Sequence, residues 1–310
     1  MGPLGLIVNG KARAVRRRHL GTPFWNRQLP TDLVRLTQDL DDLDRAVVAF
    51  RDAGVEVVAV LGGDGTAHHG IDAMIRHYDE WDLPALLVLA GGTSNGVPRA
   101  LGSGGPPERV LGRALAALSE PELPVRSLRV LRVMETATGR ARHGIGFAAG
   151  SVYPIYQRYY RHPDPGLVQA IGASVAPLLS AISGRPFQEG IRIDVRAAGA
   201  CWLSGTHTVV AGVVDDPLLW FRPFGTPLGA AEAFHLAATS MSPRQLAPRL
   251  WSVFRGRCRH RGLRTGQVRE AEVRGNTGYI IDGDLYPGGS GPGEVDVRLS
   301  LGPRFRFLVP

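Results

Sequence analysis

Two short loops of glycine and threonine have the composition of a phosphate-binding site. They occupy residues 62–66 (Gly-Gly-Asp-Gly-Thr) and residues 91–95 (Gly-Gly-Thr-Ser-Asn). Glycine adopts positive φ without strain and lets a ligand approach bare backbone N–H groups. A helix that starts behind such a loop adds partial positive charge. The two loops therefore predict that the protein binds a nucleotide phosphate.

Each loop follows an apolar run that would position it. Residues 55–61 and 85–90 are short and apolar, as expected for buried strands. Behind the first loop, residues 67–78 carry Ile71, Met74 and Ile75 at helical spacing. The order is thus strand, glycine turn, helix. Since the carboxyl ends of parallel strands meet at one sheet edge, we expect the two loops to lie side by side.

The rest of the first part of the chain continues this alternation. Residues 4–8 are typical of a strand, and residues 32–36 of a short strand or turn. Residues 43–52 and 107–118 have the periodicity of helices, the first ending before Gly54. Strands that alternate with helices predict a parallel sheet.

The pattern changes near residues 121–125. Short strand-like runs follow at residues 128–133, 190–197, 206–214 and 233–239, interrupted by a helical stretch at 153–182. The fold class is therefore α/β, with a parallel-sheet domain over residues 1–124 and a second, mainly antiparallel β domain over residues 125–299. A length of 310 residues agrees with two domains.

The first loop carries the strongest family signal. GGDGT resembles the signature of the diacylglycerol kinase catalytic domain, shared by sphingosine kinases and bacterial YegS-type lipid kinases and, more distantly, by NAD kinases and phosphofructokinases. Neither the GxxxxGK[ST] P-loop nor the GxGxxG fingerprint occurs. Further stretches resemble the lipid-kinase branch in the expected order, at residues 6–9 (LIVN), 92–95 (GTSN), 144–147 (GIGF), 280–284 (IIDGD) and 304–310.

The resemblance implies a phosphotransferase that uses ATP and Mg²⁺ to phosphorylate a lipid hydroxyl, on diacylglycerol or a related lipid. Phosphoryl transfer needs positioning and charge neutralisation more than covalent help. The resemblance also implies that the C-terminal strand, about residues 300–310, returns to the first domain. The implied nucleotide-binding residues are Asn9, Thr37, Gly62, Gly63, Asp64, Gly65, Thr66, Gly92, Thr93 and Asn95.

Asp64 is the only charged residue within the first loop. Related kinases suggest that it orients the acceptor hydroxyl or binds Mg²⁺ together with the nucleotide phosphates. It is therefore a candidate catalytic residue and the candidate metal ligand. The alternative is an Asx turn in which Asp64 caps the helix that follows.

The late motif supplies the other candidate catalytic residues, Asp282 and Asp284. By resemblance, a carboxylate here takes the proton from the lipid hydroxyl. In a strand, both side chains would project from one face. The alternative is a hairpin turn of the Asp-Gly type. Asp284 stands where the family has glutamate, so its carboxylate reaches one methylene less far.

Some positions depart from the family pattern. His69, preceded by His68, stands where the family has a glutamate, and Gly96 stands where an aspartate is frequent. The family's first phosphate loop has the pattern NPxxG, but residues 9–13 read NGKAR. Gly10 therefore stands at the position of the proline and Arg13 at the position of the glycine. These departures keep open a non-catalytic, lipid-binding regulatory protein on the same scaffold. A soluble-metabolite kinase of the NAD kinase type is the other alternative, disfavoured by the Asp-Gly-Asp of the late motif.

The net charge of +8 and a pI of about 10.1 indicate an anionic partner. Residues 244–264 mix seven arginines with Leu250, Trp251 and Phe254, a composition suited to an anionic membrane surface. A docked helix with a solvated arginine face is the alternative, and Pro248 interrupts any long helix. Motifs for nucleic-acid binding are absent from the sequence.

The sequence favours a cytoplasmic protein that associates peripherally with a membrane. Its two cysteines agree with a reducing compartment. Its N-terminus lacks the pattern of a signal peptide. The longest apolar stretch, residues 167–182, is interrupted and too short to span a bilayer. The identity of the lipid, the nucleotide preference and the oligomeric state, with a dimer among the alternatives, are not specified by the sequence.

Overall fold

The computed structural model describes residues 3–161, 190–215, 224–225, 227–228, 232–288 and 293–310. It divides into two compact units. Unit 1 comprises Met1–Val130 with Pro303–Pro310, and unit 2 comprises Leu131–Gly302. The division falls within two long strands, β5 (Val125–Glu135) and β16 (Val295–Leu308).

Unit 1 is built on a parallel sheet with the strand order β2-β1-β3-β4-β16. Its other strands are β1 (Leu4–Asn9), β2 (Val34–Thr37), β3 (Val57–Gly62) and β4 (Ala85–Ala90). Its helices are α1 (Arg13–Arg18), α2 (Thr22–Trp25), α3 (Leu40–Asp52), α4 (Asp64–His77), α5 (Gly96–Leu101) and α6 (Pro107–Ala117).

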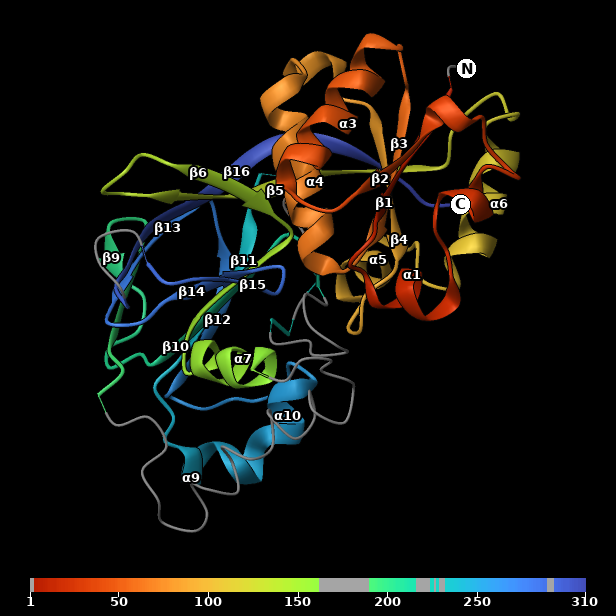
Figure 1. Ribbon diagram of the computed structural model, residues 1–310. Coiled ribbons are helices and arrows are strands. Elements are labelled where there is room, and N and C mark those ends of the chain that lie inside the picture. The colour runs from red at the N-terminus through yellow and green to blue at the C-terminus, as the bar shows by residue number, and fades with distance from the viewer. Residues whose placement is uncertain (1–2, 162–189, 216–223, 226, 229–231, 289–292) are drawn as a thin grey trace. The chain divides into compact units, whose positions relative to one another are not determined.

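Helices cover both faces of this sheet (Figure 1). On one face, Leu4, Leu6 and Val8 of β1 share a buried cluster with Val110 and Leu111 of α6. The other face carries α3 and α4. There the ring of Phe50 lies so close to Gly5 that a Cβ at Gly5 would be 2.7 Å from it. Burial on both faces explains why β3 and β4 are almost continuously apolar.

Unit 2 contains an antiparallel sheet with the order β12-β11-β10-β7-β14-β15. These strands are β7 (Gly146–Gly150), β10 (Thr208–Gly212), β11 (Phe234–Thr239), β12 (Leu263–Val268), β14 (Tyr279–Ile281) and β15 (Asp284–Tyr286). A second antiparallel group joins β16 to β13 (Glu270–Gly275), β8 (Ile193–Ala197) and β9 (Ala200–Cys201), and β5 pairs with β6 (Ala141–Gly144).

Among the described residues of unit 2, the helices are short. They are α7 (Val152–Tyr160), α9 (Pro243–Leu246) and α10 (Leu250–Phe254). A 3-10 turn at Ala247–Arg249 separates α9 from α10, so Pro248 does interrupt the helix as the sequence indicates. The predicted helix at 153–182 is confirmed as far as Tyr160, and residues 162–182 lie outside the described part of the chain.

These observations confirm the predicted fold class, a parallel α/β part followed by a mainly antiparallel part. The assignment of nucleotide binding to residues 1–124 and of lipid binding to residues 125–299 stays a prediction. Within the described residues, no helix combines the length and apolar character needed to cross a bilayer. The apolar stretch at 167–182 is not among those residues.

Candidate active site

The carboxyl ends of four parallel strands lie at one edge of the sheet in unit 1. Asn9, the last residue of β1, is level with Thr37, the last residue of β2. Gly62, the last residue of β3, is level with Ala90, the last residue of β4. This register confirms that the two glycine loops emerge side by side.

The two loops touch through their backbones. The N–H of Gly91 donates to the carbonyl of Gly62 at 2.7 Å. A Cβ at Gly91 would be 3.0 Å from the backbone of Gly62, and one at Gly92 would be 2.6 Å from the Cα of Gly63. Glycine is needed at positions 91 and 92 because the loops pack against each other, which is a reason separate from ligand binding.

Asp64 fastens the first loop to the second. Its Oδ2 accepts the N–H of Gly96 at 3.1 Å, and its Oδ1 accepts the N–H of Val97 at 2.9 Å. The residue therefore caps the start of α5. The alternative that Asp64 caps the helix that follows it is wrong, since Gly63 is the N-cap of α4 and Asp64 is already inside that helix. Gly96, where the family often has aspartate, supplies one of these N–H groups.

Side-chain amides hold the remaining parts of this edge. The Nδ2 of Asn9 donates to the Oγ1 of Thr66 at 2.8 Å, and its Oδ1 accepts the N–H of Lys11. Asn95 forms a closed pair with Gly92. Its Oδ1 accepts the N–H of Gly92 at 2.8 Å and its Nδ2 donates to the Gly92 carbonyl at 3.0 Å. Asn95 has φ of 48°, a left-handed conformation that asparagine tolerates better than most residues.

The other predicted nucleotide-binding residues differ in exposure. Gly63, Gly65 and Thr93 are half-buried in the loops. Thr37 is buried, and its hydroxyl donates to the carbonyl of Val8 at 3.4 Å. In this structure, the Thr37 side chain therefore points into its own sheet.

Gly63 is the loop position with space for a ligand. A Cβ there would meet only the Cα of Gly92, at an ordinary 3.6 Å. Gly63 also precedes α4, a helix of 14 residues whose N-cap makes no side-chain hydrogen bond. Bare backbone, open space and the positive end of a long helix occur together here.

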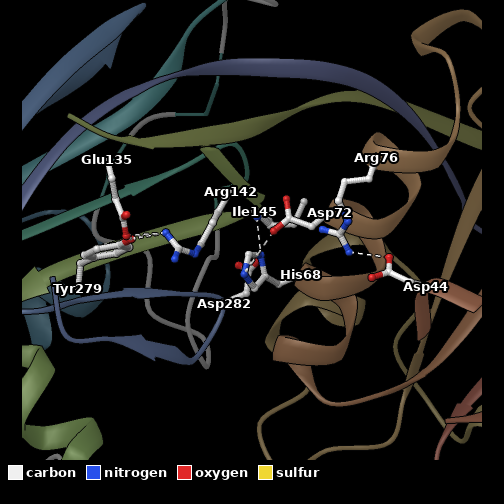
Figure 2. Close-up of polar contacts among 9 residues, drawn as sticks. All are labelled: Asp44, His68, Asp72, Arg76, Glu135, Arg142, Ile145, Tyr279 and Asp282. Atoms are coloured by element: carbon white, nitrogen blue, oxygen red, sulfur yellow. Dashed lines mark hydrogen bonds and ion pairs between the residues drawn. The ribbon is translucent and has the colours of Figure 1, made fainter. Parts of the chain in front are cut away.

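Behind this loop, α4 carries a row of polar side chains. His68 is fully buried, with Nε2 3.9 Å from Oδ2 of Asp72, and one turn further Arg76 pairs with Asp44 of α3 at 2.7 Å (Figure 2). Burial acts to raise the pKa of Asp44, but hydrogen bonds from Arg76 and His77 outweigh it and hold the pKa below its usual value. His68 is thus fully buried beside Asp72, whereas His69 is half-buried.

In unit 2, Asp282 and Asp284 belong to a tight hairpin. Ile281 pairs with Asp284, and Asp282 and Gly283 form the turn with φ of 45° and 92°. Two successive positive φ values are typical of a type I′ turn, for which Asp-Gly is a favoured sequence. A shared strand face was expected only if residues 282–284 formed one strand, and this condition is not met because the chain reverses between the two carboxylates. The hairpin alternative is the one observed.

The carboxylate of Asp282 is held by backbone. Its Oδ2 accepts the N–H of Ile145, drawn in Figure 2, and its Oδ1 accepts the N–H of Gly146, both at 2.8 Å. A Cβ at Gly144 would be 2.6 Å from Oδ2 of Asp282. The hairpin tip is thus tied to the junction of β6 and β7. Asp284 opens β15 as a half-buried residue.

A buried ion pair anchors the base of the same hairpin (Figure 2). Arg142 of β6 donates to Oε1 of Glu135 at 2.6 Å and to the hydroxyl of Tyr279 at 2.8 Å, and Tyr279 donates to the same Glu135 oxygen at 2.7 Å. The guanidinium also lies 4.3 Å from the ring centroid of Tyr286. Arg142 therefore binds residues of both β14 and β15.

The pKa values of Glu135 and Tyr279 are both shifted from their usual values. Burial acts to raise the pKa of Glu135, but hydrogen bonds from Tyr279, Thr138 and Arg142 outweigh it, so that the net shift is downward. Burial, followed by the hydrogen bond to Glu135, raises the pKa of Tyr279 well above its usual range. Both groups keep their usual charge state at neutral pH.

Comparison with known proteins assigns the first part of the chain. Residues 3–123 match the profile of the diacylglycerol kinase catalytic domain. The first part of the chain is therefore similar to the diacylglycerol kinase catalytic domain. A YegS-like lipid kinase from Stenotrophomonas maltophilia (strain K279a) is 32% identical over 98 residues, which are 31% of this chain and 32% of that protein. The similarity in sequence therefore spans about a third of that relative.

Solved structures extend the likeness in fold to the whole chain. A diacylglycerol kinase from Bacillus anthracis str. Sterne aligns with a TM-score of 0.63 at 14% identity, covering 99% of this chain and 96% of that one. Another structure from the same organism aligns with a TM-score of 0.68 at 15% identity, over 99% and 96% of the two chains. At this identity, the alignment shows a shared fold.

The diacylglycerol kinase catalytic domain contains both glycine loops and Asp64, whereas the hairpin of Asp282 and Asp284 lies outside the matched residues. Sequence reasoning did not find Glu135 or Arg142. Glu135 is a charged residue at a buried position of β5, whereas Arg142 lies in a short strand without alternation, and Tyr279, their partner, is more than 130 residues away from either.

Asp215 also makes contacts that link separate parts of unit 2. Its Oδ1 accepts the N–H of Leu228 at 3.0 Å and lies 3.0 Å from Nε2 of the buried His235. Its neighbour Asp216 lies outside the described residues. The Asp215 carboxylate thus holds the end of β10 against β11.

Proposed function

We propose that this protein is an ATP- and Mg²⁺-dependent kinase that phosphorylates the hydroxyl of a membrane lipid, with diacylglycerol or a related lipid as the acceptor. The observation that carries the proposal is the pair of glycine loops, joined through Asp64 at the carboxyl edge of a parallel sheet. The family match of these residues and the name of the YegS-like relative support a kinase that acts on a lipid.

The residues of the first loop fit a nucleotide phosphate. Space at Gly63, the uncapped start of α4 and the hydroxyl of Thr66 supply a concave backbone surface, positive charge and a polar side chain. Asp64 is the carboxylate available to Mg²⁺. Because both of its oxygens already accept N–H groups, we infer that the nucleotide phosphates supply most ligands. The metal would neutralise charge that develops on the transferred phosphate.

In this proposal, Asp284 takes the proton from the lipid hydroxyl as general base. Asp282 acts as a positioning residue, since each of its oxygens accepts a backbone N–H and the turn that it forms fixes the start of β15. The two carboxylates of the late motif thus have separate roles. Asp64 is the alternative base.

One observation favours the non-catalytic alternative. Asp64 and Asp282 each use both carboxylate oxygens to hold backbone N–H groups. The two loops and the hairpin could therefore be kept for stability alone on a scaffold that binds lipid without phosphorylating it. The presence of His69 in place of the family's glutamate agrees with a loss of catalysis.

Transfer of labelled γ-phosphate from ATP into a total lipid extract separates these functions. The proposal predicts Mg²⁺-dependent label in the organic phase. Label that appears only in a water-soluble acceptor would indicate a soluble-metabolite kinase. A protein that binds lipid but transfers no label to either phase would be the regulatory alternative, and the kinase proposal would be wrong.

We further propose that the protein associates peripherally with an anionic membrane surface, where its lipid substrate would be found. The net charge of +8 supports this partner. So does the arginine-rich segment from Arg244 to Arg264, which lies in unit 2 with all of its arginines exposed.

A further inference from the structure

One segment of unit 2 contains basic residues and no acidic ones. Between Glu232 and Glu270 the chain has eight arginines and neither aspartate nor glutamate. Every one of these arginines is exposed. An uncompensated positive surface of this extent attracts anions over about 10 Å at 0.1 M salt.

Part of this segment lines an open surface cavity of about 780 Å³. The polar residues that line it are Ser204, Ser240, Gln245, Arg259, His260 and Arg261. Among the described residues, none that lines the cavity is a carboxylate. A concave surface that offers two guanidinium groups and two hydroxyls, with no acidic side chain, is suited to a phosphate group.

Backbone contacts fix the loop that carries the two arginines. The N–H of Ser240 and the hydroxyl of Thr239, at the end of β11, both donate to the carbonyl of Gly262, at 2.8 and 2.9 Å. The N–H of Gly262 donates to Nδ1 of His260 at 3.0 Å. Because Nδ1 accepts this bond, the neutral ring carries its proton on Nε2, so His260 is also a donor. Arg259 and Arg261 flank this ring.

Gln245 is a further donor. Its Oε1 accepts the N–H of Ser242 at 2.9 Å, which leaves the amide nitrogen to donate. The lining thus consists of arginine, imidazole, amide and hydroxyl donors on a loop with defined hydrogen bonds.

The cavity is remote from the candidate base in the same unit. Its arginines directly precede β12, which forms one edge of the six-stranded sheet, whereas Asp284 begins β15 at the other edge. Five strand spacings of about 4.8 Å separate these edges, or roughly 24 Å. A phosphate bound in the cavity is therefore not the phosphate transferred in the proposed reaction.

The chain that follows Gln245 favours a lipid over a free phosphate. Gln245 lies in α9, and the chain continues through the 3-10 turn into α10 (Figure 1). Trp251 of α10 is 68% exposed, and the guanidinium of Arg255 lies 4.5 Å from its ring centroid. An exposed tryptophan beside arginine is typical of the membrane interface, where an aromatic ring lies at the level of the headgroups.

We propose that this cavity binds the phosphate headgroup of an anionic glycerophospholipid, and that it tethers the protein to the membrane independently of substrate and nucleotide. Arg259 and Arg261 neutralise the phosphate, and Trp251 contacts the adjoining interface. The inference rests on the membrane association proposed above and names the group that is bound there, but it does not require the kinase activity.

Sedimentation of the full-length protein with vesicles, without nucleotide, tests this proposal. The vesicles consist of phosphatidylcholine, alone or mixed with phosphatidylglycerol. Arg259→Gln/Arg261→Gln removes the cavity charges, and Arg244→Gln/Arg269→Gln removes the same charge from exposed positions of the same segment that do not line the cavity. Melting temperatures of all variants verify folding.

We expect the protein to prefer vesicles that contain phosphatidylglycerol. The cavity variant should bind them at least about ten-fold more weakly than the control variant, because a shared surface potential acts on both variants equally. Equal weakening by the two variants would show diffuse attraction and overturn the proposal.

Inorganic phosphate, titrated at constant ionic strength, distinguishes the source of the ligand. If the cavity takes a free phosphate, the anion should raise the melting temperature of the wild type but not of the cavity variant, and vesicle binding should not distinguish the two variants. That combination would overturn the assignment to a lipid. Because no phosphoryl transfer is measured, failure of this test and failure of the kinase proposal are separate results.

Discussion

Glycine occurs at different positions of the two loops for different physical reasons. Gly91 and Gly92 are required because the loops approach too closely for a side chain, as the Cβ distances of 3.0 and 2.6 Å show. Gly63 has no such contact, so its lack of a side chain leaves room at the start of α4. Of these three glycines, Gly63 thus combines space with the backbone that we assign to the nucleotide.

Substitution of these glycines by alanine should separate the two reasons. Gly63 has φ of −84°, which alanine adopts freely, so Gly63→Ala should keep the melting temperature. The methyl group should nevertheless reduce the thermal stabilisation that ATP with Mg²⁺ confers, through weaker binding of about ten-fold. Gly92→Ala should destabilise the protein by about 1–3 kcal/mol through overpacking. Wild-type ATP affinity in Gly63→Ala would contradict the assigned phosphate site.

Asp64 illustrates a residue whose structural role accompanies its proposed chemistry. The two oxygens of Asp64 accept the N–H groups of Gly96 and Val97. In Asp64→Asn, the amide oxygen can accept one of these N–H groups, but the new NH₂ group is a donor and faces the other N–H. We expect a loss of about 1–3 kcal/mol in unfolding free energy together with a loss of activity. Urea unfolding and rate measurements on one preparation would show both. A folded variant of unchanged stability would exclude the capping role.

At the scale of elements, the sequence predicted the strands and helices with strong periodicity and missed some of their ends. The predicted start of α3 at Leu43 is the first inward apolar residue, yet the helix begins at Leu40. Asp39 explains this, because its carboxylate accepts the N–H of Asp42 at 2.8 Å. Likewise α4 begins at Asp64 rather than at residue 67, since its first turn is glycine-rich and carries no apolar signal.

Contacts between distant elements could not be predicted from periodicity. The hairpin at Asp282 was legible as an Asp-Gly turn, but its tie to Ile145 and Gly146 joins residues that are more than 130 positions apart. Glu135 and Arg142 are close in the sequence, but the ion pair is buried because β14 and β15 cover it, which the sequence does not indicate. We conclude that these contacts position the hairpin.

Removal of one partner from this ion pair should be costly. Arg142→Met leaves the buried Glu135 carboxylate without its cation, so we expect a loss of about 3–5 kcal/mol in unfolding free energy. The double variant Glu135→Gln/Arg142→Met removes both charges and should recover much of that loss. Urea unfolding of the single and double variants measures the difference. Equal stabilities of Arg142→Met and the wild type would contradict the anchoring role.

The same ion pair makes the stability of the protein depend on pH, and the pKa of Glu135 gives the sign of this dependence. The pKa of Glu135 in the folded state lies below its ordinary value of 4.5. Its contribution to stability is therefore present above about pH 4.5 and is lost as the pH falls through the folded-state pKa. Glu135→Gln should lack this part of the acid destabilisation. An identical dependence of melting temperature on pH in the variant and the wild type would show that the carboxylate is not held in this way.

At the scale of the whole molecule, the similarity to known proteins differs along the chain. The family profile matches residues 3–123, which contain the two glycine loops that we propose to bind a nucleotide phosphate. Unit 2, Leu131–Gly302, shares a fold with solved diacylglycerol kinase structures at about 15% identity. A β scaffold tolerates most apolar exchanges that preserve its pattern. The position of the two glycine loops could therefore be predicted from sequence, whereas the lipid specificity could not.

Transfer of labelled phosphate to diacylglycerol in mixed micelles, by wild type and two Asp284 variants, tests the central claim most directly. The wild type should produce phosphorylated lipid in the presence of Mg²⁺ and ATP. Asp284→Ala should lower kcat by about 10²-fold or more with nucleotide binding retained, as expected for loss of a general base. Asp284→Glu keeps a carboxylate and should retain much of the rate. Wild-type kcat in Asp284→Ala would shift the role of base to Asp64, and the absence of labelled lipid from the wild type with any lipid acceptor would contradict the assignment as a lipid kinase.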